Sequence, residues 1–98
     1  MTFTTNSTSK VLDPKTKNRN YPEGRIIVLD DSFNTFEHVA NSLVIIIPAM
    51  SKKRSWDLAI KVDREGSAEV WRGPLEQSEL YHQQLESKGL TMAPIEKT

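Results

Sequence analysis

The stretch RIIVLDDSFNTFEHVANSLVIIIP, residues 25–48, decides the fold. The apolar, largely β-branched run at residues 26–29 ends at a pair of aspartates, which is typical of a buried central strand followed by a turn. Apolar residues then recur at the spacing of an amphipathic helix that Pro48 ends: Phe36, Val39, Ala40, Leu43, Val44 and Ile47. Asn34 or Thr35 can cap this helix, with Glu37 as a capping-box partner of Asn34.

The sequence after Pro48 predicts four more elements. Ser51 caps a second helix that runs to about residue 64 and ends at Gly66. A short strand follows at 67–71, and Pro74 stands at the first position of a third helix that Gly89 ends. Residues 90–95 alternate in polarity but contain Pro94, which indicates an edge strand. The predicted order is strand, helix, helix, strand, helix, strand.

The sequence before the first strand has a different composition. Residues 1–22 are dominated by Thr, Ser, Asn, Lys and Pro, without apolar periodicity, so burial there could not offset the entropy of ordering. We therefore predict a flexible N-terminal extension at 1–22 and one folded domain at 23–98. The extension is basic, with four cations against Asp13: Lys10, Lys15, Lys17 and Arg19.

Composition excludes several classes of function. The 98 residues have a net charge of zero and contain no cysteine, which rules out a disulfide framework, a thiol nucleophile and a cysteine-based zinc site. Basic residues cluster at 52–54 near Trp56, but the chain lacks the overall positive charge of nucleic-acid-binding modules. No apolar run is long enough to span a bilayer. We expect a cytoplasmic protein with neither a nucleic-acid nor a membrane partner.

No pattern in the sequence indicates catalysis. The two histidines, His38 and His82, fall in different predicted helices, and neither has a second metal ligand or a nucleophile at a standard spacing. We therefore predict no catalytic site, no cofactor and no metal. Ca²⁺ or Mg²⁺ bound by the aspartates after the first strand is an alternative, which the absence of a regular binding loop disfavours.

Residues 25–97 resemble the ClpS family of Clp protease adaptors. The resemblance is carried by the apolar strand that runs into Asp30 and Asp31, and by matching residues spread over the rest of the domain: Asn34, Thr35, Phe36, Val39, Met50, Ser51, residues 62–66, Trp71, Gly73 and residues 90–96. It implies an α/β (α+β) fold in which a three-stranded antiparallel sheet packs with three helices in β-α-α-β-α-β order. It also implies a monomeric adaptor that is not an enzyme. Such adaptors bind the N-terminal residue of a substrate and deliver it to a Clp unfoldase.

The resemblance also implies a binding site for the substrate's N-terminus. In the family an Asn, two Asp residues and a His surround the α-amino group, and the matching positions here are Asp30, Asp31, Ser32 and Asp63. Only Asp31 matches the family's residue. The apolar pocket for the first side chain corresponds to Asn34, Phe36, Val39, Ala59 and Val62, with Ala59 where a larger residue often stands. Neighbouring carboxylates repel, so we expect them to raise one another's pKa values and to favour a cationic ligand.

A second surface implied by the resemblance docks on the N-terminal domain of the Clp ATPase, of the ClpA or ClpC type. Glu76 matches a docking acid, whereas Tyr81 stands where the family has a basic residue. The N-terminal extension corresponds to the segment that engages the ATPase channel during delivery. An alternative is a regulator of the unfoldase, with the same fold, that has lost recognition of N-terminal residues.

Overall fold

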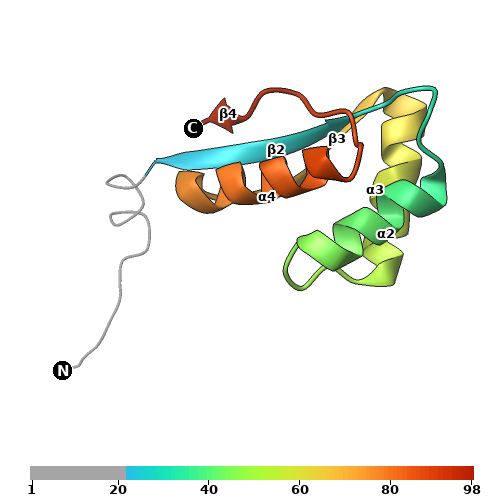
Figure 1. Ribbon diagram of the computed structural model, residues 1–98, viewed down its shortest axis with the longest axis horizontal. Helices are drawn as coiled ribbons and strands as arrows, with labels where there is room; N and C mark the ends of the chain where they lie inside the picture. Colours follow the sequence, from blue (N-terminus) through green and yellow to red (C-terminus); the bar gives the residue numbers. More distant parts are fainter. Residues whose placement is uncertain (1–21) are drawn as a thin grey trace.

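The computed structural model describes residues 22–98, which form six elements (Figure 1). They are β2 (Glu23–Leu29), α2 (Phe36–Ile46), α3 (Lys52–Glu65), β3 (Ser67–Pro74), α4 (Leu75–Ser87) and β4 (Glu96–Lys97). The predicted order of strands and helices is confirmed. The extension predicted at 1–22 lies almost wholly outside the described residues.

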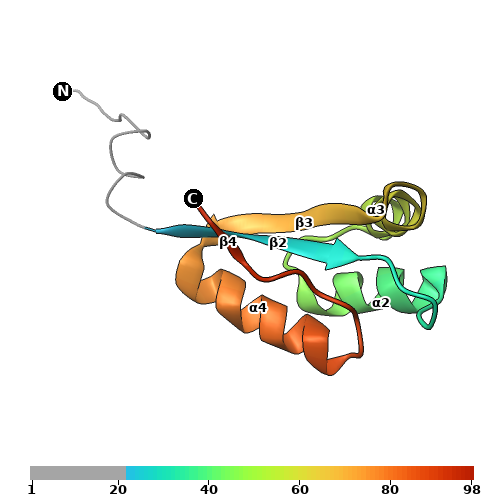
Figure 2. The same cartoon turned by 90° about the horizontal axis from the view of Figure 1, so that it is seen from above.

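The three strands form one antiparallel sheet with β2 in the centre, in the order β3-β2-β4. Along β2, Gly24, Ile26 and Val28 are buried, whereas the residues between them are only half-buried. The strand is therefore central, as predicted, but one of its two faces is covered less. Helix α4 runs along one face of the sheet, whereas α2 and α3 pack together at one end of the domain (Figure 2).

The buried face of the sheet and the apolar faces of the helices form a single core. It is made of buried side chains from both sheet and helices: Ile26, Val28, Val39, Ala40, Leu43, Ile47, Met50, Leu58, Ala59, Val62, Ala68, Val70, Leu85 and Leu90. The apolar residues from which the first helix was predicted belong to this core, with two exceptions: Val44 is half-buried, and Phe36 is partly exposed. This core fixes α2 against α3.

The helix ends follow the sequence with small shifts. Thr35 is the N-cap of α2 and accepts a hydrogen bond from the His38 N–H at 3.1 Å, and Ser51 caps α3 in the same way through Arg54. Helix α2 ends at Ile46 because Ile47, which precedes Pro48, is extended. Pro74 is the N-cap of α4 instead of its first residue.

Strand β3 is longer than predicted and contains an irregularity. Its register with β2 pairs Ile26 with Trp71 and Ile27 with Glu69, so Val70 is an extra residue opposite β2. Trp71 is half-buried and meets Tyr81 of α4 edge to face, with ring centroids 5.0 Å apart. Trp71 thus belongs to the packing between the sheet and α4.

The predicted edge strand at 90–95 is displaced towards the C-terminus. Only an isolated bridge joins Met92 to Val28, and the regular pairing of β4 lies at Glu96 and Lys97. Pro94 has no N–H to donate, which interrupts the ladder before β4 begins. Arg25 then ties the three strands together, because its guanidinium pairs with Glu69 of β3 at 2.6 Å and Glu96 of β4 at 2.5 Å.

Both histidines connect separate segments of the chain, because a ring nitrogen of each donates a hydrogen bond to a backbone carbonyl oxygen. The Nε2 atom of His38 lies 2.7 Å from the Lys88 carbonyl oxygen, and that of His82 lies 2.8 Å from the Ala93 carbonyl oxygen. Since a carbonyl only accepts, each ring nitrogen is the donor. These contacts join α2 to the end of α4, and α4 to the C-terminal segment.

Gly24 allows α4 to lie close to the sheet, and its replacement tests this packing. An alanine Cβ at this position would overlap the Ser78 hydroxyl and lie 2.9 Å from Ile95 Cγ2. We expect Gly24→Ala to lower the free energy of unfolding in urea by about 1–3 kcal/mol through overpacking. Removing the Ser78 hydroxyl in the Gly24→Ala/Ser78→Ala double variant should restore part of this loss. An unchanged midpoint for Gly24→Ala would contradict the close approach.

Candidate functional site

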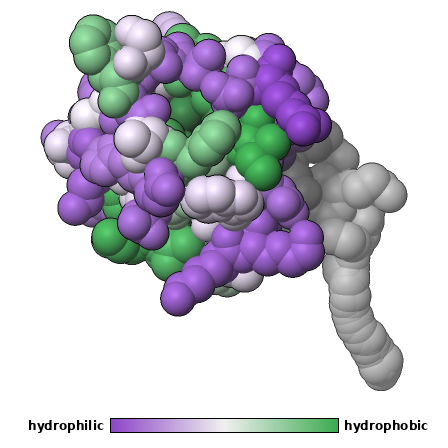
Figure 3. Space-filling view, turned by 90° about the vertical axis from the view of Figure 1, so that its right-hand side faces the viewer, coloured by the Kyte–Doolittle hydropathy of each residue, from purple (hydrophilic) through white to green (hydrophobic). Residues whose placement is uncertain are grey.

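A pocket opens where the end of β2, the start of α2 and the C-terminal half of α3 meet. Its cavity volume is about 270 Å³. The lining residues are Asp30, Asp31, Asn34, Thr35, Phe36, Glu37, Val39, Ala59, Val62 and Asp63. Figure 3 shows this end of the molecule, where hydrophobic side chains emerge among hydrophilic ones. The pocket therefore combines an acidic part with an apolar part.

The acidic part contains four carboxylates, from Asp30, Asp31, Glu37 and Asp63, and none of the lining residues is basic. Asp30 and Asp63 are exposed, and neither belongs to an ion pair among residues 22–98. The backbone fixes Asp30, because its N–H donates to the Gly66 carbonyl oxygen at 2.9 Å. These two carboxylates have acceptor oxygens open to a ligand.

Asp31 differs from these two carboxylates because the protein itself satisfies its oxygens. Its Oδ1 accepts from the backbone N–H groups of Phe33 and Asn34, both at 2.8 Å. Its Oδ2 accepts from the Asn34 side-chain amide at 2.6 Å and the Thr91 hydroxyl at 2.7 Å. Four donors fill the capacity of one carboxylate.

These hydrogen bonds hold the pKa of Asp31 well below its usual range, the Asn34 N–H and the Thr91 hydroxyl contributing most. The expectation that neighbouring carboxylates raise one another's pKa is therefore wrong for Asp31. Donors within the protein outweigh the effect of burial, which alone raises this pKa, and the carboxylate stays charged without a bound cation.

Asn34 joins the pocket to the turn after α4. Its side-chain nitrogen donates to Asp31 and also to the Gly89 carbonyl oxygen at 3.0 Å. Both amide hydrogens are thereby used, and the amide carbonyl oxygen remains as an acceptor at the pocket. The expected capping box between Asn34 and Glu37 is not formed, since the Asn34 N–H donates to Asp31 instead.

The apolar part of the pocket is lined by buried side chains and by one partly exposed side chain. Val39, Ala59 and Val62 are buried and line the pocket from α2 and α3. Phe36 stands at the start of α2 and is 40% exposed. Ala59 contributes only a methyl group to this lining.

The structure brings together eight of the nine residues expected to form the binding site. Ser32 is the exception, because it is exposed and does not line the pocket. The turn pinned by Asp31 Oδ1 includes Ser32 and carries it outside the cavity. Sequence reasoning missed Thr35 and Glu37 as lining residues, and it missed Thr91, which approaches from the far end of the chain.

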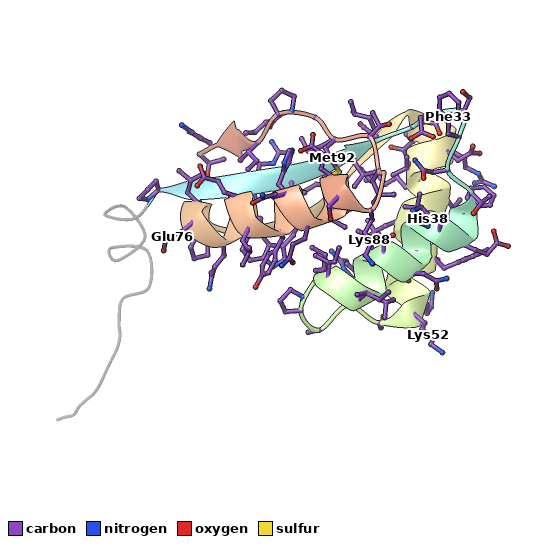
Figure 4. The ribbon with its side chains drawn as sticks, viewed as in Figure 1. Phe33, His38, Lys52, Glu76, Lys88 and Met92 are labelled. Carbon is purple, nitrogen blue, oxygen red and sulfur yellow. The ribbon has the colours of Figure 1, made fainter. Side chains whose placement is uncertain are left out.

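The two expected docking residues lie on different sides of α4. Glu76 is exposed in the first turn, at the end of α4 remote from Phe33 and His38 (Figure 4). It lines a second hollow of about 380 Å³ together with Pro22, Pro74, Leu75 and Glu79. Tyr81 packs against Trp71 and does not line this hollow.

Two structural features are absent from the described part of the chain. Residues 22–98 contain no group of three His, Asp or Glu side chains placed to hold a metal ion, so the Ca²⁺ or Mg²⁺ alternative is not supported. None of the helices in this range is both long enough and apolar enough to cross a bilayer.

Comparisons with known proteins agree in fold and sequence. The family model for the ATP-dependent Clp protease adaptor protein ClpS matches residues 19–93. The chain is 54% identical over 82 residues to an ATP-dependent Clp protease adapter protein ClpS of Synechocystis, covering 84% of each chain. It is 51% identical over 94 residues to a Nostoc protein of the same name, covering 92% of this chain and 97% of that protein.

A solved structure shares the fold at low sequence identity. The structure of Agrobacterium tumefaciens ClpS2 bound to L-phenylalaninamide matches with a TM-score of 0.71 and 19% identity. The match covers 80% of this chain and 98% of that chain.

The hydrogen bonds to Asp31 predict a stability effect that is separate from ligand binding. Asp31→Asn removes the charge and replaces an acceptor with a donor facing Asn34 and Thr91. We expect the free energy of unfolding in urea at pH 7 to fall by about 1–2 kcal/mol. Asp63→Asn, which breaks no such bond, should change it by less than about 0.5 kcal/mol.

The effect of Asp31→Asn should depend on pH with a defined sign. Folding lowers the pKa of Asp31. The contribution of this carboxylate to the free energy of unfolding is therefore complete above the pKa of an unfolded aspartate, and it is lost as the pH falls towards the pKa of Asp31 in the folded protein. The difference between the wild type and Asp31→Asn should therefore shrink below about pH 4. A difference that grows on acidification would contradict the assigned hydrogen bonds.

Proposed function

The chain belongs to the ClpS family of ATP-dependent Clp protease adaptors, and from this premise we propose that it binds substrates by their N-terminal residue and delivers them to a Clp unfoldase. The observation that carries the proposal is the cluster of carboxylates at the mouth of an apolar pocket. The protein acts in this proposal by binding, without catalysis of its own.

The acidic part suits the α-amino group of a protein chain. An ammonium has three N–H donors, and three acceptor groups at the pocket are open to it: the carboxylates of Asp30 and Asp63 and the side-chain carbonyl of Asn34. Asp31 adds negative charge and holds Asn34 in place. Acetylation removes the positive charge and donors, so a blocked N-terminus loses these charge-assisted hydrogen bonds.

The apolar part suits the first side chain of the substrate. Val39, Ala59 and Val62 offer a buried floor, and the cavity of about 270 Å³ is small for anything beyond a single residue. The fold relative from Agrobacterium tumefaciens is described as bound to L-phenylalaninamide, which combines a free amine with an aromatic side chain. That ligand supports the same division of the pocket here.

The acid-rich site of this chain sets it apart from the family pattern. Asp30 and Asp63 stand where the family has Asn and His, and Ser32 lies outside the pocket. We therefore assign the amine to Asp30, Asp63 and Asn34, and exclude Ser32 from its contacts. Exposed carboxylates act through a field that salt screens, so affinity should fall with ionic strength.

A second candidate is a regulator of the unfoldase that binds no N-terminus. The observation that favours it is the saturation of Asp31, which removes the need for a cation to stabilise this carboxylate. The open acceptors on Asp30 and Asp63 favour the first candidate. Binding measurements with peptides decide between them.

The proposed docking surface on the Clp ATPase lies at the start of α4. Glu76 and Glu79 stand beside the apolar side chains of Pro22, Pro74 and Leu75 around a hollow of about 380 Å³. We place the N-terminal domain of a ClpA- or ClpC-type ATPase here and leave Tyr81 out, because its ring is engaged by Trp71. The surface includes Pro22, the last residue of the predicted N-terminal extension.

Peptides with free and acetylated N-termini test recognition of the amine. We expect a peptide with a free N-terminal Phe to bind, and its acetylated form to bind at least tenfold more weakly, measured by fluorescence anisotropy. The Asp30→Asn/Asp63→Asn double variant should bind the peptide with the free N-terminus about tenfold more weakly, or weaker still, than the wild type. Asp57→Asn, an exposed acid on α3 paired with Lys53 and outside this pocket, is the matched control. Equal binding of both peptides, or of neither, would favour the regulator.

Charge reversal at Glu76 tests the docking surface. Glu76→Lys places a cation at the start of α4, and we expect it to weaken binding to the Clp ATPase hexamer about tenfold while leaving peptide affinity unchanged. Glu86→Lys, at the other end of the same helix, serves as the control for net charge. Equal ATPase affinity of the two variants would move the docking surface elsewhere.

A further inference from the structure

Aromatic side chains are concentrated near the pocket. Among residues 22–98, five large apolar side chains are exposed, and three of them are aromatic: Phe33 at 89%, Phe36 at 40% and Trp56 at 40%. Phe36 and Trp56 touch across the α2–α3 interface, with ring centroids 5.9 Å apart and planes inclined by 57°. This partly exposed pair joins the two helices that form the pocket, and only its Phe36 member lines the cavity itself.

The spacing along α3 places this pair away from the acidic part. Trp56, Ala59 and Asp63 stand at i, i+3 and i+7 and therefore share one face of the helix. At a rise of about 1.5 Å per residue, Trp56 lies roughly 10 Å along the axis from Asp63. Ala59 stands between them, carries only a methyl group, and lines the same cavity as Asp63 and Phe36.

We propose that Trp56 is a specificity-determining residue that, with Phe36, forms an aromatic wall selecting long aromatic side chains at the substrate's N-terminus. This inference rests on the proposed binding of N-terminal residues. With the amine at Asp30 and Asp63, the side chain runs past Ala59 towards Phe36. A Trp, Tyr or Phe ring reaches the wall, whereas a Leu side chain ends at its methyl groups before it.

The wall favours aromatic ligands for two physical reasons. Aromatic rings attract one another in tilted or edge-to-face arrangements, beyond the gain from buried area. Phe36 is partly exposed at the first residue of α2, and its contact with Trp56 limits the positions its ring can take. Trp56 thus supplies contact area and holds the Phe36 ring in a fixed place.

The test compares peptides that differ only in their first residue, Trp or Leu, each with a free N-terminus. We expect the wild type to bind the Trp peptide more tightly than the Leu peptide. Trp56→Ala should lower the affinity for the Trp peptide by about three- to tenfold, and it should change the affinity for the Leu peptide by less than about twofold. Trp56→Phe keeps an aromatic ring and should restore most of the preference. Leu80→Ala, which removes an exposed apolar side chain from α4, is the matched control.

The outcomes separate this inference from the proposed function. If neither free peptide binds, or if acetylated peptides bind equally well, the proposed function fails, and the inference with it. If free peptides bind but Trp56→Ala weakens Trp and Leu peptides by the same factor, the wall is not selective and only the inference fails. A lower melting temperature shared by Trp56→Ala and Trp56→Phe, without a change in the Trp-to-Leu ratio, would also overturn it.

Fluorescence gives a second measurement that does not depend on affinity. The chain has two tryptophans, so Trp71→Phe leaves Trp56 as its only indole. A peptide that begins with Phe should shift the emission of this variant on binding, and its acetylated form should not. Saturable binding of the free peptide without any change in Trp56 emission would contradict contact at the wall.

Discussion

The carboxylate of Asp31 is the constraint on which the geometry of the site depends. Its four hydrogen bonds join the turn after β2, the residue before the N-cap of α2 and the segment that follows α4. Because Thr91 is 60 residues from Asp31 in the sequence, one charged group sets the position of the C-terminal segment relative to the loop between β2 and α2. A charge-assisted hydrogen bond is stronger than a neutral one, so the negative charge is part of the architecture.

This arrangement divides the work among the acids of the pocket. Asp31 uses its acceptor capacity within the protein, whereas Asp30 and Asp63 belong to no ion pair among residues 22–98. Asn34 connects the two roles, since its amide hydrogens are bound to Asp31 and Gly89 and its carbonyl stays available. A preorganised acceptor set loses little conformational entropy when an amine binds.

The sequence alone predicted what depends on local pattern. The strand at 26–29, the three helices and the cap at Ser51 follow from periodicity and capping chemistry, which left the first cap open between Asn34 and Thr35, and the resemblance pointed to the residues around the pocket. Contacts between distant segments could not be predicted in this way. No spacing rule links Asp31 to Thr91, and the extra residue in β3 that accommodates Trp71 depends on pairing with β2. The turn that carries Ser32 away from the pocket also depends on Asp31.

The sheet and α4 keep the two proposed sites at opposite ends of the domain. The pocket lies where α2 and α3 pack beyond β2, whereas Glu76 and its apolar neighbours lie near the opposite end of β2. Gly24 and Ser78 lock α4 to the sheet, and His38 with Asn34 lock the far end of α4 to α2 and its preceding turn. In the proposed function, a helix fixed at both ends holds the bound substrate and the unfoldase at a constant separation. Delivery, as proposed, then depends on this spacing and on the predicted extension that precedes the domain.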